Sequence, residues 1–159
     1  MNLKILCVGR LKERFYEEAA AEFTKRLSRY GKIELIEVPD EKAPEQMSDA
    51  QRLQVMNREG ERILARLDEG EPLIALCIEG KEMPSEALAK RLSDMALMGK
   101  SRVAFAIGGS LGLSEAVKKR AELLLSFSPM TFSHQIFRVM LLEQLYRACK
   151  INAGEPYHK

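Results

Sequence analysis

Two nearly continuous apolar runs constrain the fold of this chain more than any other feature of its sequence. They are Leu73–Ile78 (LIALCI) and Val103–Ile107 (VAFAI), and each is followed within two residues by a glycine. Short runs of this kind are typical of strands that are covered on both faces, as strands are in parallel sheets. The chain must therefore place helices on either side of these two strands.

The rest of the sequence alternates strand patterns with helix patterns. Further strands are predicted at 3–8, 33–38 and 123–127, and Ile33–Val38 alternates apolar with acidic residues, which favours a strand near an edge. Helices are predicted at about 12–30, 48–67, 85–98, from 114 onward, and 133–152. This order predicts an α/β fold with a parallel sheet and helices on both faces. A length of 159 residues suits one domain, 1–159.

Composition and charge narrow the functional classes. The chain has 25 basic and 23 acidic residues, so a basic surface for nucleic acid must be local, or a larger assembly must present the RNA. Cys7 and Cys77 lie inside apolar runs, and three cysteines without ligand spacing indicate buried thiols and no metal. The sequence shows no signal-peptide pattern and no membrane-spanning stretch. We therefore expect a soluble cytoplasmic protein without a membrane partner.

A glycine-rich turn, Ile107–Leu113 (IGGSLGL), follows one of the buried strands and precedes a helix. In parallel α/β sheets ligands bind beyond the carboxyl ends of the strands, and glycines let the main chain approach a ligand closely. The G-G-x-x-G spacing matches neither the dinucleotide fingerprint nor the P-loop. The turn by itself is equally consistent with a ligand site and with a tight connection.

A second loop follows the last predicted strand. Its residues are Phe127, Ser128, Pro129, Met130, Thr131 and Phe132. Aromatic and thioether groups beside hydroxyls suit an adenine or a sulfonium ligand, although for this loop alone a hydrophobic connector into the last helix is the favoured interpretation. Two such loops at strand ends indicate a shared pocket more strongly than either loop does alone.

The last predicted helix is apolar around most of its circumference. In a chain of this length that pattern favours a second subunit, and a symmetric homodimer is the default, while a helix packed inside the monomer is the alternative. The polar exceptions are His134, Arg138, Glu143 and Arg147. Glu143 and Arg147 have the spacing of an ion pair, and we interpret a lone His134 as a structural residue.

Together these segments resemble the ribosomal RNA large subunit methyltransferase H family, the pseudouridine N3-methyltransferases of the trefoil-knot (SPOUT) superfamily. The resemblance covers essentially the whole chain. It rests on Ile5–Lys12, VPDEKAPE at 38–45, EGKEMPSEALA at 79–89, FAIGGSLGL at 105–113, LSFSPMTFSHQIFRVMLLEQLYRA at 125–148 and GEPYHK at 154–159.

The resemblance implies a fold and a cofactor that periodicity does not show. The implied fold is the SPOUT methyltransferase fold, a parallel sheet with a C-terminal trefoil knot, whereas the general rule is that chains do not knot. The implied methyl donor is S-adenosylmethionine. The positions that match the family's cofactor contacts are Leu76, Gly108 and the run Phe127–Phe132.

The implied reaction is methylation of N3 of a pseudouridine in large-subunit (23S) ribosomal RNA, on the assembled ribosome. N3 carries a proton that must be lost before it attacks, so a base or a stabilising cation is expected. Our hypothesis is that His158 or Glu143 assists this loss. Arg138 or Arg147 would hold phosphate or the developing anion, and Tyr157 would stack on or bond the base, with a homodimer bringing the tail to the pocket.

Two other classes are consistent with parts of the sequence. One is a nucleotide-dependent dehydrogenase, which the spacing of the glycine turn disfavours. The other is a noncatalytic dimeric RNA-binding protein, which would not bind S-adenosylmethionine.

Overall fold

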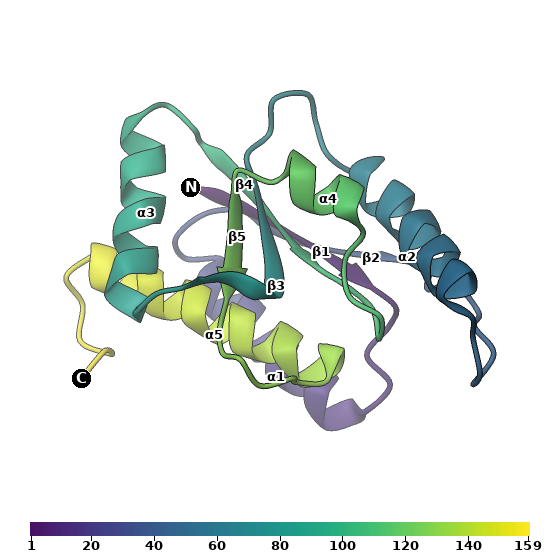
Figure 1. The fold of residues 1–159 in the computed structure, drawn as a ribbon. Coiled ribbons are helices and arrows are strands. Elements are labelled where there is room, and N and C mark those ends of the chain that lie inside the picture. The colour runs from purple at the N-terminus through teal and green to yellow at the C-terminus, as the bar shows by residue number, and fades with distance from the viewer.

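The computed structural model describes residues 1–159, which form five strands and five helices (Figure 1). The strands are β1 (Asn2–Val8), β2 (Ile33–Val38), β3 (Leu73–Glu82), β4 (Arg102–Ile107) and β5 (Leu123–Ser126). The helices are α1 (Arg14–Leu27), α2 (Asp49–Leu64), α3 (Ser85–Leu97), α4 (Glu115–Arg120) and α5 (His134–Asn152). All neighbouring strands pair in parallel, in the order β2-β1-β4-β3-β5. The predicted α/β fold and the edge position of β2 are confirmed.

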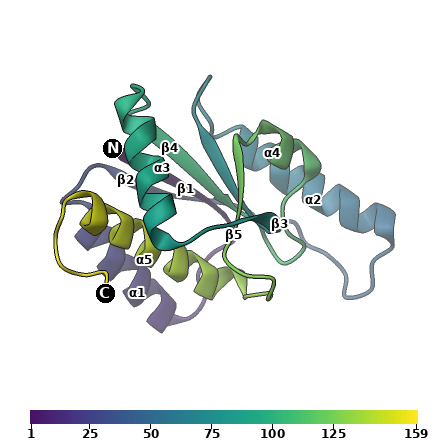
Figure 2. The ribbon, with the colours of Figure 1, turned by 60° about the vertical axis from the view of Figure 1, so that its left-hand side comes forward.

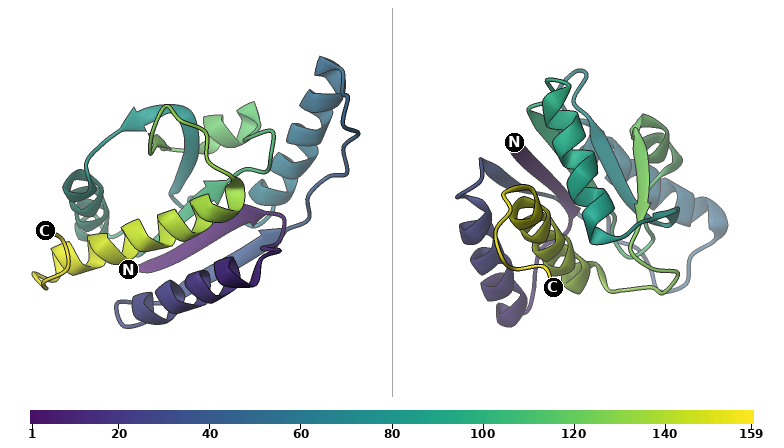
Figure 3. Two further views of the ribbon diagram at one scale, coloured as in Figure 1. Left: turned by 90° about the horizontal axis from the view of Figure 1, so that it is seen from below. Right: turned by 90° about the vertical axis from the view of Figure 1, so that its left-hand side faces the viewer.

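Helices cover both faces of the sheet, as Figure 2 and the right-hand view of Figure 3 show. One core cluster joins α1, α3 and α5 to side chains such as Ile5 and Phe105, and a second joins α2 and α4 to Leu6 and Ala106. Successive strand residues point to opposite faces, so each central strand contributes to both clusters. This arrangement explains why β1, β3 and β4 are apolar at almost every buried position.

Helix α5 packs between α1 and α3 (Figure 3). Leu141, Leu142 and Leu145 are fully buried in this position. Much of the apolar circumference of α5 is thus used inside the protomer, but Ile136 stays 39% exposed on its open side. No helix of the structure combines the length and the apolar character needed to cross a bilayer.

Strand β3 continues four residues beyond the apolar run that predicted it. Leu76 pairs with Leu125, the register then shifts, and Lys81 pairs with Leu125 again. At Gly80 a Cβ atom would lie 2.7 Å from the main-chain carbon of Leu124, so only glycine permits this approach. The polar residues of this extension carry no strand pattern, and the contact with β5 decides their conformation. The close crossing is consistent with the knot that the resemblance implies.

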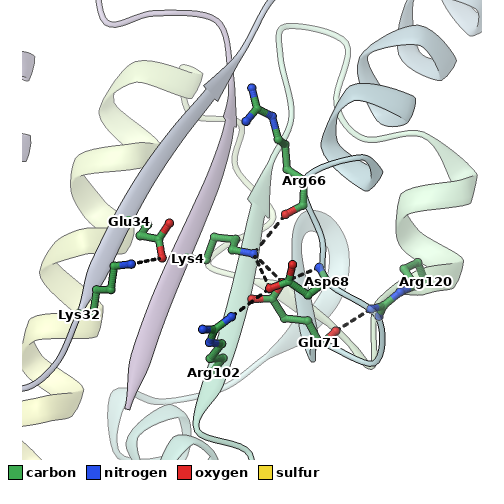
Figure 4. Close-up of polar contacts among 8 residues, drawn as sticks. All are labelled: Lys4, Lys32, Glu34, Arg66, Asp68, Glu71, Arg102 and Arg120. Atoms are coloured by element: carbon green, nitrogen blue, oxygen red, sulfur yellow. Dashed lines mark hydrogen bonds and ion pairs between the residues drawn. The ribbon is translucent and has the colours of Figure 1, made fainter.

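A network of charges closes the opposite, amino end of the sheet (Figure 4). Lys4 Nζ lies 2.7 Å from Glu71 Oε2, and these two side chains are 11% and 3% exposed. Lys4 also donates to the carbonyl oxygen of Arg66, while Arg120 donates to the carbonyl oxygen of Glu71. The network ties the connection between α2 and β3 to β1 and α4. It lies away from the strand ends that bind ligands in such sheets.

We predict that Lys4→Met lowers the free energy of unfolding by about 3 kcal/mol, because the buried Glu71 carboxylate loses its cation. Urea denaturation at fixed protein concentration measures the loss. The control is Lys32→Met, whose partner Glu34 lies 3.1 Å away in a pair that is 68% and 42% exposed. That variant should change stability by less than about 1 kcal/mol. Equal effects of the two substitutions would contradict the structural role of the Lys4–Glu71 pair.

Candidate functional site

A cavity of about 660 Å³ lies at the carboxyl ends of β4 and β5, beside the middle of β3 where its register shifts. Three segments line most of it, 76–79, 107–113 and 126–134 apart from position 129, and Met56, Lys118 and Phe137 complete the wall. A volume of this size suits a ligand as large as a nucleoside with a side chain. The structure thus places the glycine turn and the loop after β5 on one cavity, at the edge where parallel sheets bind ligands.

The glycine turn is folded tightly on itself. Gly109 and Gly112 form an isolated bridge, and Gly112 N donates to Gly109 O at 3.0 Å. A Cβ atom at Gly108 would lie 2.6 Å from the main-chain carbon of Gly112, and Gly112 has a φ of +88°. Only glycine fits these two positions without strain. The turn is therefore both a tight connection and a wall of the cavity that presents main chain rather than side chains.

The loop after β5 supplies an apolar wall with polar edges. The Phe127 and Phe137 ring centroids lie 4.8 Å apart, and the Phe132 ring stacks beside Phe137 at 6.2 Å. Ser128 Oγ accepts a hydrogen bond from Met130 N, which holds the turn of the loop. The predicted cofactor residues that line the cavity are Leu76, Gly108, Phe127, Ser128, Met130, Thr131 and Phe132. Pro129 belongs to the loop but does not line the cavity.

Two charged residues at the rim were not singled out by the sequence analysis. Lys118 Nζ lies 2.5 Å from Glu79 Oε1, and both residues line the cavity. The hydrogen bond from Lys118 lowers the pKa of Glu79, and the same bond raises the pKa of Lys118. Glu79 lies in the polar extension of β3 and Lys118 on α4, so no sequence pattern links them.

Cys77 also lines the cavity and is only partly buried, whereas Cys7 is fully buried as expected. Burial raises the pKa of the Cys77 thiol. The prediction that Cys77 is a buried core thiol is therefore wrong, because β3 leaves the sheet interior just after Leu76.

His134 lies at the first position of α5 and lines the cavity. Its ring makes no hydrogen bond to the rest of the protein, unlike a histidine that is held in place for structure. Burial lowers the pKa of His134, and the charges of Arg138 and Lys12 lower it further. The sequence interpretation of a structural histidine does not match this geometry. The signal that sequence analysis undervalued is its place directly after the loop 127–132.

Arg138 is bound elsewhere in the protomer. Its side chain is 3% exposed, and its guanidinium lies 2.7 Å from Glu37 Oε2 and donates to the carbonyl oxygen of Gly9 at 3.0 Å. These contacts fix the first turns of α5 to the carboxyl ends of β1 and β2. Arg138 does not line the cavity, so the structure does not place this predicted catalytic residue against a ligand there.

The other predicted catalytic residues form a cluster where the tail folds back on α5. Glu143 Oε1 accepts from Arg147 at 2.6 Å and from Tyr157 Oη at 3.0 Å. One ring nitrogen of His158 lies 3.2 Å from Arg147, and the other lies 2.7 Å from Glu86. Every polar group of this tail cluster is thus held by a partner.

The tail cluster and the cavity lie at different parts of α5. Glu143 follows His134 by nine positions, which corresponds to about 13 Å along a helix axis. Figure 3 shows the C-terminus beside the far end of α5. The structure therefore does not bring His158, Tyr157 and Glu143 to the cavity of the same protomer.

Comparison with known proteins assigns this fold and cavity to a class. Residues 1–158 match the family described as predicted SPOUT methyltransferase. The chain belongs to this family, so it is a methyltransferase of the SPOUT fold. Among curated relatives, it is 54% identical to Ribosomal RNA large subunit methyltransferase H of Exiguobacterium sp. (strain ATCC BAA-1283 / AT1b) and 53% identical to the protein of that name from Lactobacillus delbrueckii subsp. bulgaricus (strain ATCC BAA-365 / Lb-18). Both alignments span 159 residues and cover 100% of each chain.

Solved structures show the same fold at low sequence identity. The tRNA (m1G37) methyltransferase from Aquifex aeolicus superimposes with a TM-score of 0.55 and 15% identity, covering 100% of this chain and 75% of that one. A probable methylase family protein from Haemophilus influenzae Rd KW20 gives a TM-score of 0.55 and 14% identity over 99% of this chain and 70% of the other.

We predict that a ligand filling the cavity slows alkylation of Cys77 but not of Cys149. Cys77 lines the cavity, whereas Cys149 is partly buried on α5 away from it. Burial raises the pKa of both thiols, so both reactions should accelerate with pH beyond the ordinary thiol range. Mass spectrometry of peptides after timed iodoacetamide treatment measures the two rates. Equal protection of both cysteines would argue against this placement of the ligand.

Proposed function

We propose that this chain transfers the methyl group of S-adenosylmethionine to N3 of a pseudouridine in large-subunit ribosomal RNA. The observation that carries the proposal is the cavity between β3 and the ends of β4 and β5, in a chain that matches ribosomal RNA methyltransferases over its full length. We also propose that the substrate is the assembled ribosome, because a net charge of +2 gives little general attraction to free RNA. A ribosomal substrate would place the reaction in the cytoplasm.

The cavity fits the cofactor chemically. Phe127 and Phe132 offer apolar surface for an adenine ring, and the glycine turn at Gly108 offers main-chain donors and acceptors without side-chain bulk. Leu76, Gly108 and the loop 127–132 would hold the cofactor, and the Glu79–Lys118 pair lies at the rim. The bound cofactor supplies an already activated methyl group, so the protein mainly positions the two reactants.

The target base must be held over the cavity and must lose its N3 proton. The tail residues Tyr157 and His158 have the chemistry to stack on and bond the base, with Glu143 aligning them. They lie too far from the cavity of their own protomer, so we propose that the partner subunit of a homodimer contributes them. Arg147 would hold phosphate, and Arg138 would stabilise the developing anion through its positive field.

The open side of α5 supports this dimer. A groove of about 630 Å³ runs along it, lined by Ile136, Val139 and Met140 together with Phe23 and Leu88. Eight of its twelve lining residues are hydrophobic, and Glu143 stands at its edge beside the tail cluster. A symmetric contact on this surface would bury the groove. It would also direct the tail of each subunit toward the cavity of the other.

The first test is calorimetric titration with S-adenosylmethionine. We expect the wild type to bind and Gly108→Val to lose binding, because the new side chain collides with the Gly112 main chain. The control is Ala96→Val, which adds the same side chain at an exposed position of α3 that does not line the cavity. Lack of binding by a folded wild type would favour a noncatalytic RNA-binding protein. Methyl transfer to ribosomes that lack this modification, located by mass spectrometry of RNA fragments, then tests the substrate.

The dimer is tested separately by sedimentation equilibrium. We predict a dimer for the wild type and a shift to monomer for Met140→Glu, because burying an unpaired carboxylate in the groove is unfavourable. The matched control is Leu97→Glu, since Leu97 is 84% exposed at the end of α3. A monomeric wild type would remove the proposed route by which the tail reaches the cavity.

A further inference from the structure

Four ionisable side chains line the cavity: Cys77, Glu79, Lys118 and His134. Three of them are poor proton acceptors at neutral pH. Glu79 is ion-paired with Lys118, and that bond lowers the pKa of Glu79 and raises the pKa of Lys118. Burial raises the pKa of Cys77, so this group stays a protonated thiol. His134 is the remaining group, and its burial lowers the pKa of the imidazole, which favours the neutral, proton-accepting ring.

The position of His134 suits a proton acceptor. It begins α5 directly after the loop 127–132, and the ring nitrogens are free of protein hydrogen bonds. The helix is fixed on the sheet by Arg138. Its first turn is also held by Lys12 N, which donates to Gln135 Oε1 at 2.9 Å. The imidazole is therefore held at the cavity wall, and both of its ring nitrogens remain available to a ligand.

We propose that His134 is a catalytic residue that accepts the N3 proton of the target base during methyl transfer. This inference rests on the proposed function and names the base of that reaction. The N3–H bond breaks and its proton moves to an unprotonated ring nitrogen of His134. The electron pair left on N3 forms the new bond to the methyl carbon, and the methyl–sulfur bond breaks with its electrons on sulfur. Water then takes the proton from the imidazolium.

The surroundings of His134 keep the acceptor form available. Burial lowers its pKa below the ordinary value of 6.5, and Arg138 and Lys12 lower it further, while Asp40 opposes them. The amino end of a helix also disfavours a positive charge. Because the neutral ring is the base, the rate of methyl transfer must fall as the pH decreases through this lowered pKa.

His158 is the natural comparison, because the chain contains two histidines. Both ring nitrogens of His158 are already within hydrogen-bond distance of Arg147 and Glu86. A ring with both nitrogens engaged binds and orients more readily than it accepts a proton. We assign orientation of the base to His158 and proton transfer to His134.

The test combines NMR titration with single-turnover kinetics on ribosomes that lack the methyl group. With two histidines, His134→Gln and His158→Gln assign the two ring resonances, and each pKa is then read directly. We expect the wild-type rate of methyl transfer to fall at low pH, in an acid limb of the pH–rate profile whose midpoint matches the measured pKa of His134. We expect His134→Gln to keep its affinity for S-adenosylmethionine, lose at least about 100-fold in rate and lose the acid limb.

His158→Gln is the matched control and should weaken the apparent affinity for ribosomes while keeping the acid limb. His134→Ala should regain activity with added imidazole, which a purely structural histidine would not show. An acid limb that persists in His134→Gln, or that disappears in His158→Gln, overturns the assignment. If the wild type methylates no ribosome at all, the proposed function itself is contradicted.

Discussion

The close main-chain contact between Gly80 and β5 is the constraint on which the rest of the structure depends. With a Cβ at Gly80 only 2.7 Å from Leu124 C, no other residue lets the end of β3 cross β5 at this distance. The crossing sets the loop after β5 beside the end of β3, across from the glycine turn after β4. Two loops and a stretch of β3 thereby enclose one cavity, and α5 must start at its wall.

Helix α5 then carries candidate catalytic residues at two separate places along its length. Its first residue, His134, stands at the cavity, whereas Glu143 and the tail stand about 13 Å further along the helix. The buried Arg138, bound to Glu37 and Gly9, fixes the position of α5 on the sheet. The helix therefore cannot shift along its axis to carry Glu143 and the tail to the cavity. A rigid helix with both parts on it calls for two protomers, which is the physical reason that our proposed reaction uses a dimer.

Local patterns predicted the secondary structure well where a residue's neighbours in sequence decide its conformation. The capping box of Ser48 with Gln51 begins α2, and the Ser114 and Ser133 hydroxyls accept hydrogen bonds at the starts of α4 and α5. The polar end of β3 was missed, because its partner β5 lies more than 40 residues away. The partial exposure of Cys77 and the pairing of Glu79 with Lys118 follow from that same extension.

The sequence by itself determined the parallel α/β architecture, the two-sided burial of β3 and β4, and the two loops that line the cavity. Apolar periodicity and glycine placement are local properties, so they can be read along the chain. Only the tertiary structure decided that Arg138 is bound by Glu37, that the tail folds away from the cavity, and that His134 stands unpartnered at its wall. These facts depend on contacts between distant segments, whose geometry no spacing in the sequence encodes.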